Sequence, residues 1–225
     1  THAIEREANV LFKPNSGPQT EFLAAPEREV LYGGSAGGGK SYAMLADPLR
    51  FMGHPAFSGL LLRHTTEELR ELISKSQELY PKVWPGIKWS ERKMQWTAPS
   101  GARLWMSYLD RDDDVMRYQG LAFSWIGFDE LTQWPTPYAW NYMRSRLRST
   151  APDLEVYMRA TTNPGGPGHQ WVKKMFIDPA PYDTSFAATD IETGEALKYP
   201  AGHSKAGKPL FKRRFIPARL SDNPY

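Results

Sequence analysis

The chain has 225 residues, 40% of them apolar, so it is long enough to bury one sizeable hydrophobic core. No stretch approaches the roughly 20 consecutive apolar residues that a membrane-spanning helix needs. The absence of cysteine excludes disulfides and thiolate metal sites. We therefore predict a single α/β domain that does not engage a membrane.

The formal net charge of +3 says little by itself, but the basic residues are unevenly distributed. Seven of them lie between Glu195 and Asp222 with no acidic residue among them, and Arg144, Arg146 and Arg148 form a second group. Such groups are either solvated surface or contacts with a polyanion. Composition leaves both interpretations open.

The first part of the chain, residues 1–28, is a mostly polar lead-in to the first strand. A turn signal at 14–18 precedes a short helix predicted from Gln19 to Ala25. The apolar run Glu29–Tyr32 then predicts a short buried strand.

The next stretch contains Gly34-x-x-x-x-Gly39-Lys40-Ser41, which fills every position of the phosphate-loop pattern. Its glycines let the backbone approach phosphate oxygens closely. In this pattern Lys40 contacts the β- and γ-phosphates, Ser41 coordinates Mg²⁺, and a helix over Ser41–Asp47 directs its positive end at the anion. A glycine-rich turn that matches by accident is the alternative, and the flanking strand and helix argue against it. The predicted nucleotide-binding residues of the loop are Gly34, Ser35, Ala36, Gly37, Gly38, Gly39, Lys40 and Ser41.

Beyond the loop, strands and helices alternate, which predicts a parallel sheet. A second strand is predicted over Gly59–Arg63, and Thr65-Thr-Glu-Glu68 is a capping box that starts a helix running to about Tyr80. Residues 87–109 break this alternation with short β-type runs separated by turns. They predict an antiparallel meander at a sheet edge.

The apolar strand Phe123–Phe128 ends in two carboxylates, Asp129 and Glu130. A domain that hydrolyses nucleotides needs one carboxylate for the Mg²⁺ shell and another that polarises water. We assign Asp129 to the first role and Glu130, as catalytic residue, to the second. The alternative is a strand that simply leaves the core.

The last part of the chain is predicted to hold a helix over 135–148, a strand over 154–161 and a second helix from Trp171 to Ile177. The turn sequence Asn163-Pro-Gly-Gly follows the strand. A hairpin-like insertion rich in Gly, Lys and Pro is predicted to fill 183–217.

Together these motifs resemble the ATPase domain of a large terminase subunit, the DNA-packaging motor of tailed bacteriophages. The resemblance covers nearly the whole chain and depends on the order and spacing of the motifs. They are Gly-Pro-Gln19, the loop ending in Lys40-Ser41, Leu-Leu-Leu-Arg63-His-Thr, Arg117-Tyr-Gln-Gly120, Ile-Gly-Phe-Asp129-Glu130-Leu-Thr-Gln, Thr162-Asn163-Pro-Gly-Gly and Ser-Asp222-Asn-Pro.

The resemblance implies a P-loop NTPase fold of the ASCE type, with a central mostly parallel sheet, antiparallel edge strands and helices on both faces. It implies one ATPase domain over 1–225, consisting of the lead-in, a P-loop core over 29–178, and the hairpin-like insertion with the start of a linker over 179–225. Whole large terminases add a carboxyl-terminal nuclease domain. No second carboxylate cluster follows Glu195, so no nuclease activity is expected.

Further site residues are implied by the same resemblance. Gln19 would read the adenine edge, since an amide offers donor and acceptor together; an ordinary surface glutamine is the alternative. Arg117 would be a catalytic arginine finger acting on a neighbouring subunit. Arg63 is its rival, and an ion pair with Asp112–Asp114 is the structural alternative. Thr162-Asn163 would couple nucleotide state to movement, with plain turn chemistry as the alternative.

The implied function is Mg²⁺-dependent ATP hydrolysis that drives double-stranded DNA into a procapsid. The implied partners are DNA, a portal protein, a small terminase subunit and further copies in a ring, on a procapsid in the host bacterial cytoplasm. Two alternatives stay open: a helicase-like translocase, and an assembly module that binds ATP but turns over little.

Overall fold

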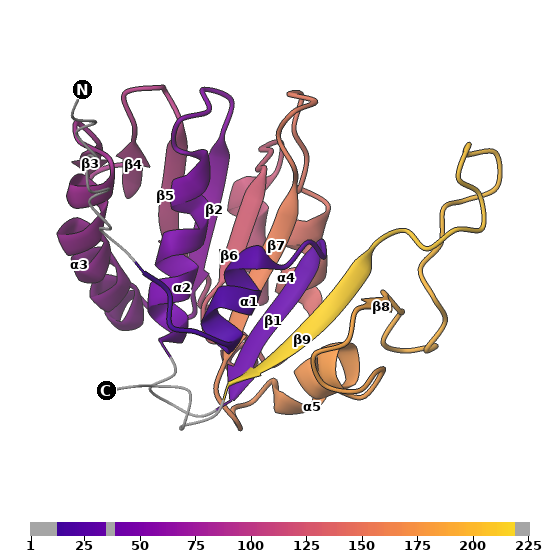
Figure 1. Cartoon of the computed structure of the whole chain (residues 1–225). Helices are drawn as coiled ribbons and strands as arrows, with labels where there is room; N and C mark the ends of the chain where they lie inside the picture. Colours follow the sequence, from indigo (N-terminus) through magenta and orange to yellow (C-terminus); the bar gives the residue numbers. More distant parts are fainter. Residues whose placement is uncertain (1–12, 35–38, 219–225) are drawn as a thin grey trace, which may run out of the picture.

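The computed structural model describes residues 13–34 and 39–218. Four residues of the predicted nucleotide-binding loop, Ser35, Ala36, Gly37 and Gly38, lie outside the described residues. The strands of the described chain are β1 (Glu29–Gly34), β2 (Ser58–Arg63), β3 (Lys88–Ser90), β4 (Gln95–Thr97), β5 (Arg103–Tyr108), β6 (Trp125–Phe128), β7 (Tyr157–Thr162), β8 (Phe186–Ala187) and β9 (Lys212–Ala218). They form one sheet in the order β3-β4-β5-β2-β6-β7-β1-β9-β8 (Figure 1).

The inner part of this sheet is parallel. β2 pairs in parallel with β5 and β6, β7 with β6 and β1, and β1 with β9. At one edge β3, β4 and β5 form the predicted antiparallel meander, and at the other edge β8 runs antiparallel to β9. The predicted sheet, mostly parallel with antiparallel edge strands, is confirmed.

Helices cover both faces of the sheet, as predicted (Figure 1). The α-helices are α1 (Pro18–Ala24), α2 (Lys40–Ala46), α3 (Thr66–Val83), α4 (Tyr138–Arg144) and α5 (His169–Val172). Three short 3-10 turns and a π-helical turn complete them, at Asp47–Phe51, Asp112–Tyr118, Leu131–Gln133 and Lys173–Ile177. α1, α2 and α3 bury one hydrophobic cluster, and α4 and α5 bury a second on the opposite face. Within the described residues, no helix is both long and apolar enough to cross a membrane.

Local signals account for where two of these helices begin. At the start of α3 the Thr65 hydroxyl accepts from the Glu68 backbone N–H (3.4 Å), and the Glu68 carboxylate accepts from the Thr65 N–H (3.3 Å), so the capping box is present. α4 begins later than the helix predicted over 135–148, because Pro137 occupies its N-cap and disfavours helical backbone at the residue before it, and α4 also ends earlier, with Ser145 at its C-cap.

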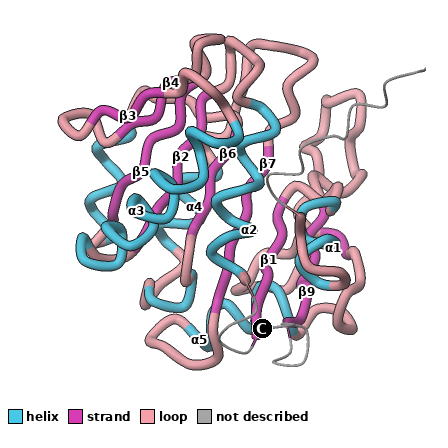
Figure 2. Tube along the Cα trace, turned by 60° about the vertical axis from the view of Figure 1, so that its left-hand side comes forward, coloured by secondary structure: helices cyan, strands magenta, loops and turns pink. Residues whose placement is uncertain are grey.

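The hairpin-like insertion predicted over 183–217 needs correction, because its end returns to the sheet. β9 pairs in parallel with β1 along its length. Its run of basic residues concealed this strand in the sequence. Arg213 is buried there and donates to Glu29 (2.7 Å), so a charge expected at the surface forms an internal ion pair. Residues 188–211, between β8 and β9, do leave the sheet, and Figure 2 shows them as loop.

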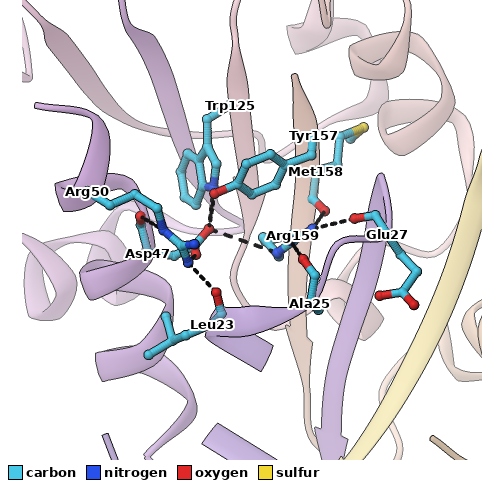
Figure 3. Close-up of polar contacts among 9 residues, drawn as sticks. All are labelled: Leu23, Ala25, Glu27, Asp47, Arg50, Trp125, Tyr157, Met158 and Arg159. Atoms are coloured by element: carbon cyan, nitrogen blue, oxygen red, sulfur yellow. Dashed lines mark hydrogen bonds and ion pairs between the residues drawn. The ribbon is translucent and has the colours of Figure 1, made fainter. Parts of the chain in front are cut away.

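A buried polar network lies at the amino ends of β6 and β7 (Figure 3). Asp47, directly after α2, is fully buried and accepts hydrogen bonds from Trp125 Nε1 (2.7 Å), Tyr157 Oη (3.0 Å) and Arg50. Arg159 Nε lies 3.9 Å from Asp47 Oδ2. The terminal nitrogens of Arg159 donate to the carbonyl oxygens of Ala25, Glu27 and Met158. The network therefore connects the segment after α1 and the end of α2 to the central strands β6 and β7 through hydrogen bonds and ion pairs.

Candidate functional site

The phosphate-loop segment connects the carboxyl end of β1 to the amino end of α2, as the sequence predicts. Both described glycines that flank it occupy positive φ, at 137° for Gly34 and 68° for Gly39. A Cβ on Gly34 would lie 1.9 Å from the Ala218 carbonyl oxygen, and one on Gly39 would lie 2.6 Å from Gln19 Nε2. Larger residues at these two positions would therefore be strained as well as crowded.

The Lys40 side chain is buried beside the two carboxylates of the predicted site. Its Nζ donates to the Gly34 carbonyl oxygen (3.4 Å), so this hydrogen bond joins the two ends of the phosphate-loop segment. Burial lowers the pKa of Lys40, and the charges of Glu130 and Asp129 act in the opposite direction. Ser41 is the second residue of α2 and is half-buried. The structure thus brings the loop lysine and both acidic residues together, as predicted from their order in the sequence.

Three side chains meet on the α2 face at the carboxyl ends of neighbouring strands. Gly127 of β6 faces α2, because a Cβ on it would lie 2.9 Å from the Met44 sulfur. Side chains alternate along a strand, so Asp129 faces α2 as well. Arg63 at the end of β2 and Thr161 of β7 both contact Asp129 and share this side.

Asp129 is the centre of this cluster and is fully buried. Its Oδ1 accepts a hydrogen bond from the Thr161 hydroxyl, and its Oδ2 lies 3.2 Å from Arg63 Nε in an ion pair. Within the described residues, Nη1 of the buried Arg63 has no hydrogen-bond partner, and Asp129 Oδ2 and Arg63 Nε have no partner beyond this ion pair. Buried polar atoms are normally satisfied, so the cluster holds capacity to bind a further polar group.

Glu130 is held in a strained conformation beside Asp129. Its φ of 62° is left-handed, which a non-glycine residue adopts at a cost of about 1–3 kcal/mol. Its N–H donates to Thr161 Oγ1 (3.0 Å), and its carboxylate accepts from the Asn163 backbone N–H (3.1 Å) and Asn163 Nδ2 (2.5 Å). Burial and the neighbouring charge of Asp129 raise the pKa of Glu130. A raised pKa makes this carboxylate a better proton acceptor near neutral pH.

The cluster suits Mg²⁺ that arrives with a nucleotide. Mg²⁺ prefers oxygen ligands, keeps several waters, and is usually bound through one or two carboxylates plus substrate phosphates. Asp129 Oδ2, which lacks a hydrogen-bond partner in the described chain, and the Ser41 hydroxyl are ligands of this type. No group of three or more His, Cys, Asp or Glu in the described residues could hold a metal by itself.

The two residues predicted to couple nucleotide state to movement, Thr162 and Asn163, have different side-chain partners. Asn163 contacts Glu130, but the Thr162 hydroxyl donates to the Asn163 carbonyl oxygen (3.0 Å) and lies 3.0 Å from Thr132 Oγ1. The threonine that contacts both acidic residues is Thr161, which was not among the predicted site residues. The alternation of β7 is the signal that finds it, because Thr161 shares the face of Arg159 and Thr162 does not.

Gln19 is buried beside Gly39, so it is not an ordinary surface glutamine. Its Nε2 donates to the Gly39 carbonyl oxygen (2.9 Å) and its Oε1 accepts from the Asn15 N–H (2.6 Å). It therefore connects α1 to the start of α2. Its role in reading adenine stays a prediction.

Arg117 lies outside the cluster, at the end of the 3-10 turn Asp112–Tyr118. Its guanidinium donates to the carbonyl oxygens of Tyr108 (2.7 Å) and Asp114 (3.2 Å) and lies 3.5 Å from the Asp114 carboxylate. This is the local ion pair considered as its structural alternative. The side chain is nevertheless 45% exposed, whereas the rival Arg63 is buried within its own cluster.

The fold and the site together define an α/β domain of the P-loop NTPase type. A family model described as "Terminase large subunit, T4likevirus-type, N-terminal" matches residues 31–202. Since this match spans most of the sequence, the chain belongs to the family of large terminase subunits.

Solved structures of phage packaging proteins share this fold. The large terminase of a thermophilic bacteriophage matches with a TM-score of 0.63 and 16% identity, over 94% of this chain and 47% of that chain. This chain therefore spans about half the length of that protein. A mutant ATPase domain of the Thermus phage P74-26 large terminase matches with a TM-score of 0.58 and 13% identity, over 94% of this chain and 83% of that chain. The amino-terminal domain of the bacteriophage phi29 DNA packaging ATPase matches with a TM-score of 0.50 and 18% identity, over 66% of this chain and 78% of that chain. A search of curated proteins found no match.

Proposed function

We propose that this chain is the ATPase motor domain of a large terminase, which hydrolyses ATP with Mg²⁺ and drives double-stranded DNA into a procapsid. One observation carries the proposal: the buried Asp129 and the half-buried Glu130 lie beside Lys40 at the loop, with polar atoms of the described cluster left unsatisfied. The large terminase of the thermophilic bacteriophage supports a nucleotide as the missing group, because its structure has been determined in complex with ADP and with ATP-gamma-S.

Each residue of the cluster has a distinct role in this proposal. Lys40 holds the β- and γ-phosphates, and Ser41 and Asp129 hold Mg²⁺, which when bound neutralises charge on the phosphates. Glu130 accepts the proton of the attacking water, and Asn163 fixes the orientation of its carboxylate. Arg63 pairs with Asp129 through Nε, keeps Nη1 without a hydrogen-bond partner among the described residues, and contributes positive charge to the same site in cis.

Assembly into a ring would complete the site. An arginine that acts in trans must reach the surface of its own subunit, and Arg117 does so whereas Arg63 does not. We therefore assign Arg117 as the finger. The portal, the small terminase subunit, the DNA and a location on the procapsid in the bacterial cytoplasm belong to the same proposal, with Thr162 and Asn163 coupling hydrolysis to movement.

The test is ATP binding by Lys40→Ala, with Lys82→Ala, an exposed lysine of α3, as the matched control. We expect Lys40→Ala to abolish tight binding and leave the fold intact, because it removes a charge-assisted phosphate contact, and the control to bind like wild type. Affinity of Lys40→Ala within a few-fold of wild type would contradict the assignment. Tight binding without turnover by the assembled wild type would indicate a nucleotide-gated assembly module instead.

A further inference from the structure

Residues 188–211, which we call the arm, leave the sheet between β8 and β9 and project beyond it (Figure 1). The arm is held by its own backbone hydrogen bonds. Leu197 N–H donates to the Ala188 carbonyl oxygen (2.7 Å), Leu210 N–H donates to that of Leu197 (2.7 Å), and Tyr199 N–H donates to that of Lys208 (3.0 Å). It is therefore a folded element with a defined tip.

The tip of the arm, residues 198–208, contains basic residues and no acidic residue. Lys198, Lys205 and Lys208 are exposed, and the sequence from 196 to 211 contains no acidic residue. The acidic residues of the arm all belong to its first turn, nearer the sheet: Asp190, Glu192 and Glu195.

These lysines differ from two arginines that the sequence groups with them. Arg213 pairs with Glu29 and Arg214 pairs with Asp183, so a neighbouring carboxylate compensates the charge of each arginine. No ion pair of the described chain involves an arm lysine, although Lys205 Nζ lies 5.8 Å from the centre of the Tyr199 ring. Of the exposed lysines between Glu195 and Ala218 that form no ion pair in the described chain, three lie at the tip and the fourth, Lys212, begins β9.

We propose that the tip of the arm contacts the phosphate backbone of duplex DNA, which rests on the proposed function of the domain as a DNA motor. Duplex DNA carries one negative charge per about 1.7 Å of its axis, and lysines bind phosphates as point charges without reading base sequence. A motor that moves along any sequence requires contacts of this kind.

The composition of the tip favours DNA over a protein partner. The centre of a protein interface is built from apolar and aromatic anchors. Residues 200–210 are all exposed and include only Leu210 as a large aliphatic side chain. The one aromatic residue of the tip, Tyr199, is half-buried and stacks on His203 with ring centres 4.5 Å apart. It stabilises the tip and presents no free anchor.

The turn at the tip is ordered before any partner binds. His203 N–H donates to the Pro200 carbonyl oxygen (3.2 Å), Ala206 N–H to that of His203 (2.8 Å), and Lys208 N–H to that of Lys205 (3.0 Å). Preorganisation reduces the entropy lost on binding. The lysines would therefore approach DNA as one group.

The test is the salt dependence of DNA binding, measured by fluorescence anisotropy with a labelled duplex of mixed sequence. The variant carries Lys198→Gln, Lys205→Gln and Lys208→Gln. The matched control carries Lys82→Gln, Lys88→Gln and Lys93→Gln, three exposed lysines near the opposite edge of the sheet. Each phosphate contact contributes about 0.9 to the slope of log affinity against log salt concentration. We expect the slope of the arm variant to fall by about 2 to 3 and the slope of the control to equal that of wild type.

Thermal unfolding of both variants verifies that they are folded. A wild-type slope in the arm variant, or an equal loss in the control, would overturn the proposal and leave an acidic protein surface as the next partner to test. Lack of DNA binding by the wild-type chain at low salt would overturn it as well. ATP hydrolysis by the wild-type chain is measured separately, so failure of the proposed enzymatic function and failure of the arm are distinguishable.

Discussion

Two buried polar clusters lie at opposite ends of β6 and β7 and on the same side of the sheet, next to the two ends of α2. At the amino ends, Asp47 accepts hydrogen bonds from three side chains, and both terminal nitrogens of Arg159 are used (Figure 3). At the carboxyl ends, Asp129 and Arg63 form an ion pair of similar burial. Both clusters pair a carboxylate with an arginine, yet they differ in how completely their atoms are bonded.

The amino-end cluster is nearly saturated in the described chain: the side-chain atoms without a hydrogen bond are Arg159 Nε, 3.9 Å from Asp47, and Glu27 Oε2 at its edge. In the described chain the carboxyl-end cluster leaves Arg63 Nη1 and Asn163 Oδ1 without a hydrogen bond, and Asp129 Oδ2 and Arg63 Nε have only each other as partners, at 3.2 Å. It also contains the left-handed Glu130. A saturated cluster stabilises the fold, whereas an unsaturated and strained cluster is arranged for a ligand. Substitutions at the two ends should therefore have different consequences.

The largest expected effect is on ATP turnover, when an arginine from a neighbouring subunit completes the carboxyl-end cluster. An arginine finger in trans is worth roughly 10³ to 10⁵ in rate, so ATP turnover per chain should rise steeply on assembly with portal and DNA. Arg117→Ala should lose this stimulation with nucleotide affinity unchanged, and Arg92→Ala, at an exposed arginine of the β3–β4 turn, should keep it.

Mixing two inactive variants sharpens the Arg117 prediction. Rings that contain both Arg117→Ala and Glu130→Gln should regain some activity, because one interface can then pair an intact finger with an intact base. Full activity of Arg117→Ala in the assembled state would place the finger elsewhere, and Arg63 would be the next arginine to change.

The amino-end cluster should respond in stability. Asp47→Asn leaves Arg159 buried without its counter-charge, and breaking such a pair costs about 3–5 kcal/mol. We expect this loss in the free energy of unfolding from urea denaturation, with ATP affinity of the folded protein close to wild type. Asp153→Asn, which changes an exposed aspartate paired with His54, is the control and should unfold like wild type. An Asp47→Asn variant as stable as wild type would remove the contrast between the clusters.

Substitution of Thr161 should have a smaller effect, and it should lower both the stability of the fold and the rate of ATP turnover. Thr161→Val removes the hydroxyl that donates to Asp129 and accepts from the Glu130 N–H. Leaving buried groups unsatisfied costs about 1–3 kcal/mol, so we expect a lower free energy of unfolding together with slower ATP turnover. Thr161→Ser keeps the hydroxyl and should restore both. If Thr161→Ser were as impaired as Thr161→Val, the methyl group and not the hydrogen bonds would matter.

Much of the site was predictable because its signals are local. The loop glycines and Lys40 stand within one short motif, and Asp129-Glu130 follows a clear apolar strand. The order of strands and helices was sufficient to predict a mostly parallel sheet, which brings the ends of its strands together at one edge. Arg63 could be named as a candidate because it also ends a predicted strand.

Long-range pairing accounts for what the sequence did not reveal. Asp47 and Arg159 carry no motif, and only the folded sheet brings them together. β9 was hidden because Arg213, a charged residue, is buried by pairing with Glu29 on the neighbouring strand. The contacts of Thr161 with Asp129 and Glu130 were not predicted, because one residue of register decides which face of β7 a side chain occupies.

The most direct test of the proposed ATPase site is ATP turnover by Glu130→Gln in the assembled state. This change keeps the shape of the side chain and removes the carboxylate that accepts the proton, so hydrolysis should fall at least about a hundredfold. ATP affinity and the unfolding midpoint should stay at wild-type values, as should turnover by Glu78→Gln, an exposed glutamate of α3. Normal turnover by Glu130→Gln would contradict the assignment, because Asp129 and Glu130 would then be only the end of a strand.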